Sequence, residues 1–152
     1  MKIKLLTILI TLFLTSCNKD RFSKETEKFN DFLVSNFDSV IESDKIYILM
    51  PMNLCGSCVD KMTKYLLNQE HKKNRFVIIL SDNTSVTFYK PKKALEGFDF
   101  IDDSKNLLVK NKIIDGNNIV VYSFKEGKIS KIIKYEPLIN DASVIEEFNN
   151  IR

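Results

Sequence analysis

Cys55 and Cys58 are separated by two residues in the stretch MNLCGSCVDKM, and they are two of only three cysteines in the chain. Thiols at this spacing can form a reversible disulfide that exchanges with other proteins, form a structural disulfide, or bind a thiophilic metal. Gly56 and Ser57 between them are small and leave access for a partner chain. This pair is the strongest candidate for chemistry in the sequence.

The residues after Cys55 have the apolar spacing of an amphipathic helix, which we expect over about residues 56–69. Cys55 then lies at the N-terminal end of the helix and Cys58 one turn inside it. The unpaired N–H groups and the positive end of a helix lower the pKa of a thiol at that place. We therefore expect Cys55 to attack as a thiolate and the more buried Cys58 to resolve the mixed disulfide. The apolar side of this helix carries Val59, Met62, Tyr65 and Leu66, and its polar side carries Asp60, Lys61 and Lys64.

At this spacing on a helix two Cβ atoms are about 5 to 6 Å apart, so a disulfide between Cys55 and Cys58 can close with a small local shift. The loop that this bond closes is very short, so the bond removes little chain entropy and adds little stability. It therefore suits a redox couple better than a structural staple. A merely structural or vestigial disulfide is the alternative.

Metal binding is the third use of such a pair. Structural zinc needs four ligands, whereas the chain offers Cys55, Cys58 and one histidine, His71, in a lysine-rich turn after the predicted helix. Copper(I) accepts thiolate and thioether ligands, and Met52 is the methionine that we expect to be exposed near the sulfurs. A copper(I) site of Cys55, Cys58 and Met52 is therefore the metal alternative. The neighbouring methionines that we assign to core packing are Met50 and Met62.

The first residues, MKIKLLTILITLFLTSCNKD, have the pattern of a bacterial lipoprotein signal peptide. Lys2 and Lys4 precede an apolar stretch of about ten residues, whereas a membrane-spanning helix needs roughly twenty. Residues 14–17, LTSC, resemble a lipobox. This resemblance implies cleavage after residue 16, lipidation of Cys17 by acyl chains such as palmitate, and anchoring to a bacterial membrane. An ordinary secretory signal with an incidental cysteine is the alternative.

We expect a signal peptide over residues 1–16, a polar tether over 17–24 and one domain over 25–152, with its core over about 45–152. The composition, 44% hydrophobic and 28% charged residues, is that of a globular chain. The formal net charge is only +3 and the basic and acidic residues are interspersed, so nucleic-acid binding is not supported. An exported compartment is oxidising, so the CxxC pair is expected as a disulfide unless something reduces it.

Helical and strand-like segments alternate along the domain. We expect helices over residues 24–43 and 56–69, from Asp103 or Ser104 to 113, and over 141–151. We expect strands over residues 45–50, 75–82, 97–102, 119–124 and 128–135. Gly127 marks a hairpin between the last two strands, and Pro91 should interrupt any helix over 83–96. The fold class is therefore α/β, with a central mixed sheet flanked by helices and a C-terminal β-hairpin and helix.

A strand, a CxxC pair at a helix start, a buried strand, and a closing hairpin with a helix resemble the thioredoxin-like fold. The exported, membrane-attached form is similar to the TlpA/ResA-type thiol–disulfide proteins, over about residues 45–152. The resemblance implies attack by Cys55 and resolution by Cys58, with no cofactor beyond the dithiol. That family usually has an aromatic residue before the first cysteine and a cis-proline opening the penultimate strand, where this chain has Leu54 and Asn118.

We therefore predict an extracytoplasmic, lipid-anchored thiol–disulfide oxidoreductase that exchanges with thiols and disulfides of other exported proteins. The residues expected to form the partner groove are Met52, Asn53, Leu54, Gly56, Ser57, Asn117 and Asn118. Two further interpretations are open: a copper(I)-binding, metallochaperone-like protein, and a thioredoxin-fold binding module without chemistry. The absence of the proline near Asn118 would leave a metal unobstructed.

Overall fold

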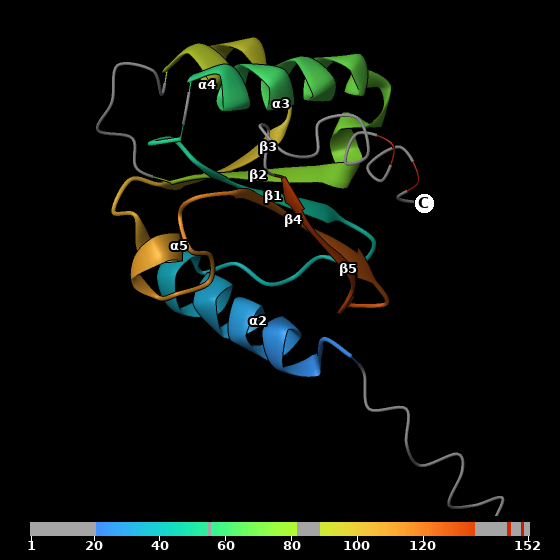
Figure 1. The fold of residues 1–152 in the computed structure, drawn as a ribbon. Helices are drawn as coiled ribbons and strands as arrows, with labels where there is room; N and C mark the ends of the chain where they lie inside the picture. Colours follow the sequence, from blue (N-terminus) through green and yellow to red (C-terminus); the bar gives the residue numbers. More distant parts are fainter. Residues whose placement is uncertain (1–20, 55, 82–88, 136–145, 147–149, 151–152) are drawn as a thin grey trace, which may run out of the picture.

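The computed structural model of the chain describes residues 21–54, 56–81, 89–135, 146 and 150. Its centre is a five-stranded sheet in the order β3-β2-β1-β4-β5 (Figure 1). β1 and β2 are parallel, as are β2 and β3, whereas β4 is antiparallel to both β1 and β5. The strands are β1 (Ile46–Pro51), β2 (Phe76–Ser81), β3 (Asp99–Asp103), β4 (Ile119–Lys125) and β5 (Lys128–Tyr135). The predicted mixed α/β sheet is confirmed.

Helices cover both faces of this sheet. α3 and α4 lie on one face, and α2 and α5 lie on the other (Figure 1). The helices are α2 (Ser23–Phe37), α3 (Gly56–Asn68), α4 (Tyr89–Ala94) and α5 (Leu107–Lys110), with a 3-10 turn η1 (Glu70–Arg75) before β2. Among the described residues, no helix has both the length and the apolar character needed to cross a membrane.

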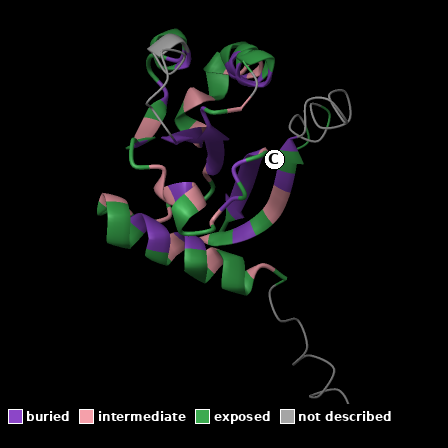
Figure 2. Ribbon diagram, turned by 60° about the vertical axis from the view of Figure 1, so that its left-hand side comes forward, coloured by how far each residue is buried: buried purple, intermediate pink, exposed green. Residues whose placement is uncertain are grey.

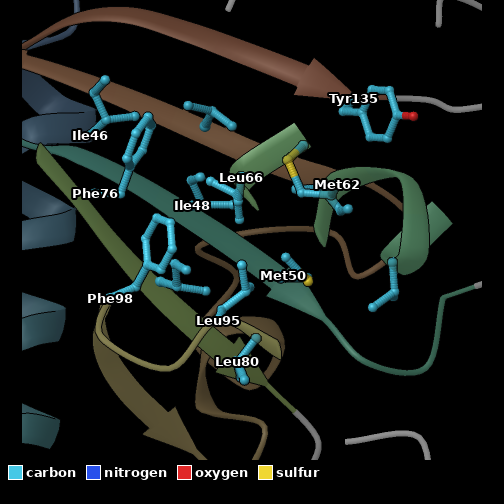
Figure 3. Close-up of a cluster of buried hydrophobic side chains, with 14 of the residues drawn as sticks. Ile46, Ile48, Met50, Met62, Leu66, Phe76, Leu80, Leu95, Phe98 and Tyr135 are labelled. Atoms are coloured by element: carbon cyan, nitrogen blue, oxygen red, sulfur yellow. The ribbon is translucent and has the colours of Figure 1, made fainter. Parts of the chain in front are cut away.

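The inner strands β1 and β2 are buried along their whole length, which explains their nearly continuous apolar sequences. Side chains of β1 alternate between the two faces, so Ile48 and Met50 pack under α3 while Tyr47 and Leu49 pack under α2. Figure 2 shows the buried residues concentrated in the strands and on the inward sides of the helices. Figure 3 shows the core on the α3 face, where Met50 and Met62 lie among aliphatic and aromatic side chains.

Aromatic residues dominate the core under α2. Phe29 is 1% exposed and meets Tyr47 and Tyr122 edge-on, with ring centroids 5.3 and 5.1 Å apart. It also stacks on Phe124 at 5.9 Å. Such pairs stabilise a core beyond the area that they bury, so α2 is a firmly held part of the domain.

The predicted hairpin is confirmed and its turn has a clear cause. Lys125 pairs directly with Lys128, so Glu126 and Gly127 form a two-residue loop. Their φ values are +53° and +75°. Two successive positive φ values define a type I′ turn, whose twist matches that of the flanking strands. Gly127 adopts a positive φ without a steric penalty, whereas the positive φ of Glu126 carries one.

The helix predicted over residues 24–43 is too long at its C-terminal end. It stops at Phe37 because Asp38 adopts a left-handed conformation with φ +51°, and its N–H bonds to the carbonyl of Leu33. Val40 lies beyond the helix and is 63% exposed. Apolar residues continue at helical spacing past Phe37, but the backbone turn at Asp38 ends the helix.

Pro91 does not interrupt the helix in its region, so that prediction is wrong. It is the third residue of α4, within the first turn, where its missing N–H has no intrahelical partner to lose.

The helix predicted from Asp103 or Ser104 to residue 113 is reduced to the single turn of α5. The strand predicted over residues 97–102 is confirmed as β3, which spans Asp99–Asp103. The C-terminal helix predicted over 141–151 lies outside the described residues except at 146 and 150.

Candidate functional site

The carboxyl ends of the three parallel strands meet at one edge of the sheet, and α3 begins at this edge after β1. Only a short segment separates Pro51 at the end of β1 from Gly56 at the start of α3. The backbone N–H of Met52 donates a hydrogen bond of 2.8 Å to the carbonyl oxygen of Ser81 at the end of β2. The segment is therefore fixed to the sheet where it leaves β1.

Cys58 lies in the first turn of α3, is 5% exposed and is disulfide-bonded. Its burial agrees with the prediction that the second cysteine of the pair is turned inward. The other cysteines, Cys17 and Cys55, lie outside the described residues. The pairing of Cys58 with Cys55 and the roles of the two sulfurs therefore stay predictions.

The predicted faces of α3 are confirmed. Besides Cys58, its buried side chains are Val59, Met62, Thr63 and Leu66, and its exposed side chains include Asp60, Lys61 and Lys64. No acidic residue occupies the first turn of α3. The positive end of the helix is therefore not neutralised by a carboxylate of its own first turn, which favours an anionic sulfur there.

The expected partner groove is only partly at the surface. Asn53, Gly56 and Ser57 are exposed and Leu54 is half-buried. Met52 is 3% exposed and belongs to the core cluster on the α3 face. The expectation that Met52 is exposed is therefore wrong, because the hydrogen bond to β2 continues the strand pairing past Pro51 and turns this side chain inward.

The Asn117–Asn118 corner lies at the same edge of the sheet. Leu49 pairs with Val120 in the antiparallel β1–β4 register, so Asn118, two residues earlier, is level with Pro51. The register thus brings together two segments that are far apart in the chain. The structure supports the predicted location of the corner, while its role in a partner groove stays a prediction.

Side-chain hydrogen bonds hold this corner in place. The carboxylate of Asp115 accepts bonds from the backbone N–H of Asn117 at 3.0 Å and from the side-chain N–H of Asn118 at 3.4 Å. Gly116 has φ +83°, and a Cβ atom there would lie 3.2 Å from a methyl carbon of Val109. A side chain here would crowd Val109, and the positive φ would strain any residue other than glycine. The sequence Asp115-Gly116-Asn117 is typical of a turn and could have predicted this one from the sequence.

Metal ligands are scarce in the described part of the chain. No group of three or more His, Cys, Asp or Glu side chains suited to a metal occurs there. His71 is exposed in η1, and Met50 and Met62 are 0% and 2% exposed in the core. The interpretation of the two methionines as core packing is confirmed.

The sequence indicated Asp103 or Ser104 as the cap of the following helix, and Asp103 has this role in α5, but the buried polar network that it forms beside the site was not predicted. The hydroxyl of Ser81 lies 2.7 Å from one carboxylate oxygen of Asp103, and both residues are at most 1% exposed. The same carboxylate accepts the backbone N–H groups of Leu107 and Leu108 at 2.7 and 2.8 Å, and Asn106 adds a contact to Ser81 at 2.9 Å. This network joins the ends of β2 and β3 to the start of α5.

The described residues thus place Cys58, the loop before α3 and the Asn117–Asn118 corner at one edge of a mixed sheet. The chain matches no protein-family model, no curated protein and no solved structure.

Proposed function

We propose that this protein is a lipid-anchored, extracytoplasmic thiol–disulfide oxidoreductase with a thioredoxin-like domain. The observation that carries the proposal is the buried disulfide sulfur of Cys58 in the first turn of α3, at the edge where the parallel strands end. Cys58 as a residue is only 5% exposed, so it is shielded from most reagents in solution, as a resolving cysteine needs to be. The order of strand, CxxC helix, strand and closing hairpin supports the resemblance to thioredoxin-like proteins.

The proposed reaction is reduction of a disulfide in another exported protein. The thiolate of Cys55 attacks one partner sulfur, forms a mixed disulfide and displaces the other partner sulfur as a thiolate. The thiol of Cys58 then loses its proton and attacks the sulfur of Cys55, which closes the internal disulfide and releases the second partner thiol. The partner gains two electrons, and a thiol reductant returns the protein to its dithiol form. Oxidation of a partner is the same sequence in reverse.

The surroundings of α3 support a reactive sulfur at position 55. The helix is 13 residues long, so its positive end is well developed, and its first turn has no carboxylate. Both effects lower the pKa of a thiol at the helix start and raise the fraction of thiolate at neutral pH. Exposed Asn53, Gly56 and Ser57 leave a surface without bulky side chains on which a partner chain can lie.

Turnover of insulin disulfides tests the exchange directly. With dithiothreitol as reductant, we expect the wild-type protein to accelerate insulin reduction above the rate of dithiothreitol alone. Both Cys55→Ser and Cys58→Ser should abolish the acceleration, and only Cys58→Ser should accumulate a mixed disulfide on a non-reducing gel, because it keeps the attacking thiol. Cys17→Ser is the matched control and should keep the full rate. A wild-type rate equal to that of dithiothreitol alone would contradict the proposal.

Anchoring by lipid at Cys17 rests on the signal-like N-terminus and needs its own test. The mature chain should begin at Cys17, carry acyl chains by mass spectrometry and partition into detergent. Cys17→Ser should remain in the aqueous phase, while Cys58→Ser should partition as the wild type does. Recovery of wild-type chains with an unmodified Cys17 would overturn the anchor.

The copper(I) alternative has less support in the structure. Its expected thioether ligand, Met52, packs in the core cluster. If copper(I) is nevertheless the ligand, one equivalent should bind in competition with a chelator, and Cys55→Ser and Cys58→Ser should abolish binding. Failure of both exchange and copper(I) binding would leave a thioredoxin-fold binding module.

A further inference from the structure

A surface cavity of about 540 Å³ lies on the face of the sheet opposite α3. Its floor is formed by Val120 and Tyr122 of β4 and by Ile132 and Lys134 of β5, and the segment 109–115 forms one wall. Glu25, in the first turn of α2, also lines the cavity. The volume is in the range of sites that hold small molecules.

Apolar side chains form much of the lining. Val109, Ile113 and Ile132 are half-buried, so each still offers apolar surface, while Ile114 and Val120 are buried beneath them. A ligand with an aliphatic body would remove this surface from water, which is favourable by roughly 25 cal/mol per Å². The cavity therefore suits an apolar group.

Two cations and a hydroxyl converge on the same cavity. Val120 pairs with Lys134 and Tyr122 pairs with Ile132, so Lys134 and Tyr122 are diagonal neighbours on one face of the hairpin. Lys112 reaches the cavity from the segment before β4. Within the part of the chain that the structure describes, the side chains of Lys112 and Lys134 make no ion pair or hydrogen bond. Both are therefore available to an anion.

The hydroxyl of Tyr122 is poorly satisfied. The side chain is 6% exposed, yet its hydroxyl donates only a long bond of 3.4 Å to the carbonyl oxygen of Ile113. Hydroxyl donors prefer about 2.7 to 2.8 Å, so a ligand oxygen would be a better acceptor. The two acidic lining residues limit the charge of such a ligand: Glu25 forms no ion pair among the described residues, and Asp115 bonds to the Asn117–Asn118 corner.

We propose that this cavity binds a small amphipathic monocarboxylate. Its carboxylate lies among Lys112, Lys134 and the Tyr122 hydroxyl, and its aliphatic body lies against Ile113 and Ile132. The charges of the two lysines are offset by the carboxylates of Glu25 and Asp115, so the cavity suits a ligand with a single negative charge, and a polyanion would be repelled by those two carboxylates. This site lies on the sheet face opposite α3, the helix that carries Cys58, and does not depend on thiol exchange.

Decanoate is the probe for this proposal, with the chain prepared as Cys17→Ser so that no acyl group competes for the cavity. In a titration followed by amide NMR, we expect shifts concentrated at Ile113, Tyr122, Ile132 and Lys134, and none along α3. Decanol, which has the same body without the charge, should bind at least about tenfold more weakly, because it cannot form charge-assisted hydrogen bonds.

The double variant Lys112→Gln/Lys134→Gln should weaken decanoate binding at least about tenfold and leave decanol binding unchanged. Tyr122→Phe should weaken decanoate binding by a smaller factor. The control is Lys64→Gln, which removes one lysine charge from the exposed face of α3 and should have no effect. Equal affinity for decanoate and decanol, unchanged affinity in the double variant, or absence of shifts at the cavity would each overturn the proposal.

Discussion

The backbone N–H of Met52 donates a hydrogen bond of 2.8 Å to the carbonyl oxygen of Ser81. Pro51 and Ser81 are the last paired residues of β1 and β2, so this bond extends the strand pairing one residue further. It turns the Met52 side chain into the core, where it is 3% exposed. The chain therefore leaves the sheet toward α3 from a fixed point.

Met52→Ala should lower the free energy of unfolding by about 2 to 4 kcal/mol, because it removes a buried side chain and leaves a cavity. Urea denaturation followed by circular dichroism measures this change. Asn53→Ala is the matched control, since the neighbouring side chain is exposed, and it should change stability by less than about 0.5 kcal/mol. Similar effects of the two substitutions would show that Met52 is not packed in the core.

Asp103→Asn should destabilise the domain by about 1 to 3 kcal/mol. The carboxylate accepts the backbone N–H groups of Leu107 and Leu108, and an amide nitrogen in place of one oxygen would face a donor. Asp102→Asn is the control, because Asp102 is exposed and its ion pair with Lys92 is long, at 3.5 Å. Thermal unfolding compares the two variants. Equal melting temperatures would contradict the structural role of the Asp103 network.

Burial, with a smaller contribution from Glu25, raises the pKa of Tyr122 from 10.0 to about 12. The folded state therefore favours the neutral phenol. This stabilisation is fully present below pH 10 and is lost as pH rises towards about 12, and a shift of this size corresponds to roughly 2 to 3 kcal/mol.

Tyr122→Phe removes this titration, so the wild type should lose stability relative to the variant as pH rises from about 10 to about 12. Urea denaturation at a series of pH values measures the difference. Burial also raises the pKa of Tyr47 and Tyr65, but both residues are present in both proteins and their effects cancel. A stability difference that does not change with pH would contradict the burial of the Tyr122 hydroxyl.

Glu126→Asn should stabilise the β4–β5 hairpin by a few tenths to about 1 kcal/mol. Asn tolerates the positive φ of this position better than Glu, and Asn-Gly is the preferred pair in a type I′ turn. Gly127→Ala should have the opposite sign, with a cost of about 1 kcal/mol, because φ is +75° there. Thermal unfolding of both variants and of the wild type measures these changes in stability. A stabilising Gly127→Ala would show that the turn is not of this type.

Local patterns predicted the strands and α3 well. The apolar runs that became β1 and β2 are buried on both faces, and the spacing of Val59, Met62 and Leu66 placed the buried side of α3 correctly. The same reasoning overran the end of α2, because a single left-handed residue, Asp38, ends the helix although the apolar spacing continues.

By itself, the sequence determined the strands, the position and buried side of α3, and the candidate cysteine pair, because helix and strand periodicities and the spacing in CxxC are properties of neighbouring residues. Only the tertiary structure decided that Met52 is buried, that Asp103 meets Ser81 from 22 positions away, and that Asn118 lies level with Pro51. The convergence of Lys112, Lys134 and Tyr122 on one cavity belongs to this second group. These relationships depend on strand register and on which face of the sheet each side chain occupies, and both are set by packing between distant segments.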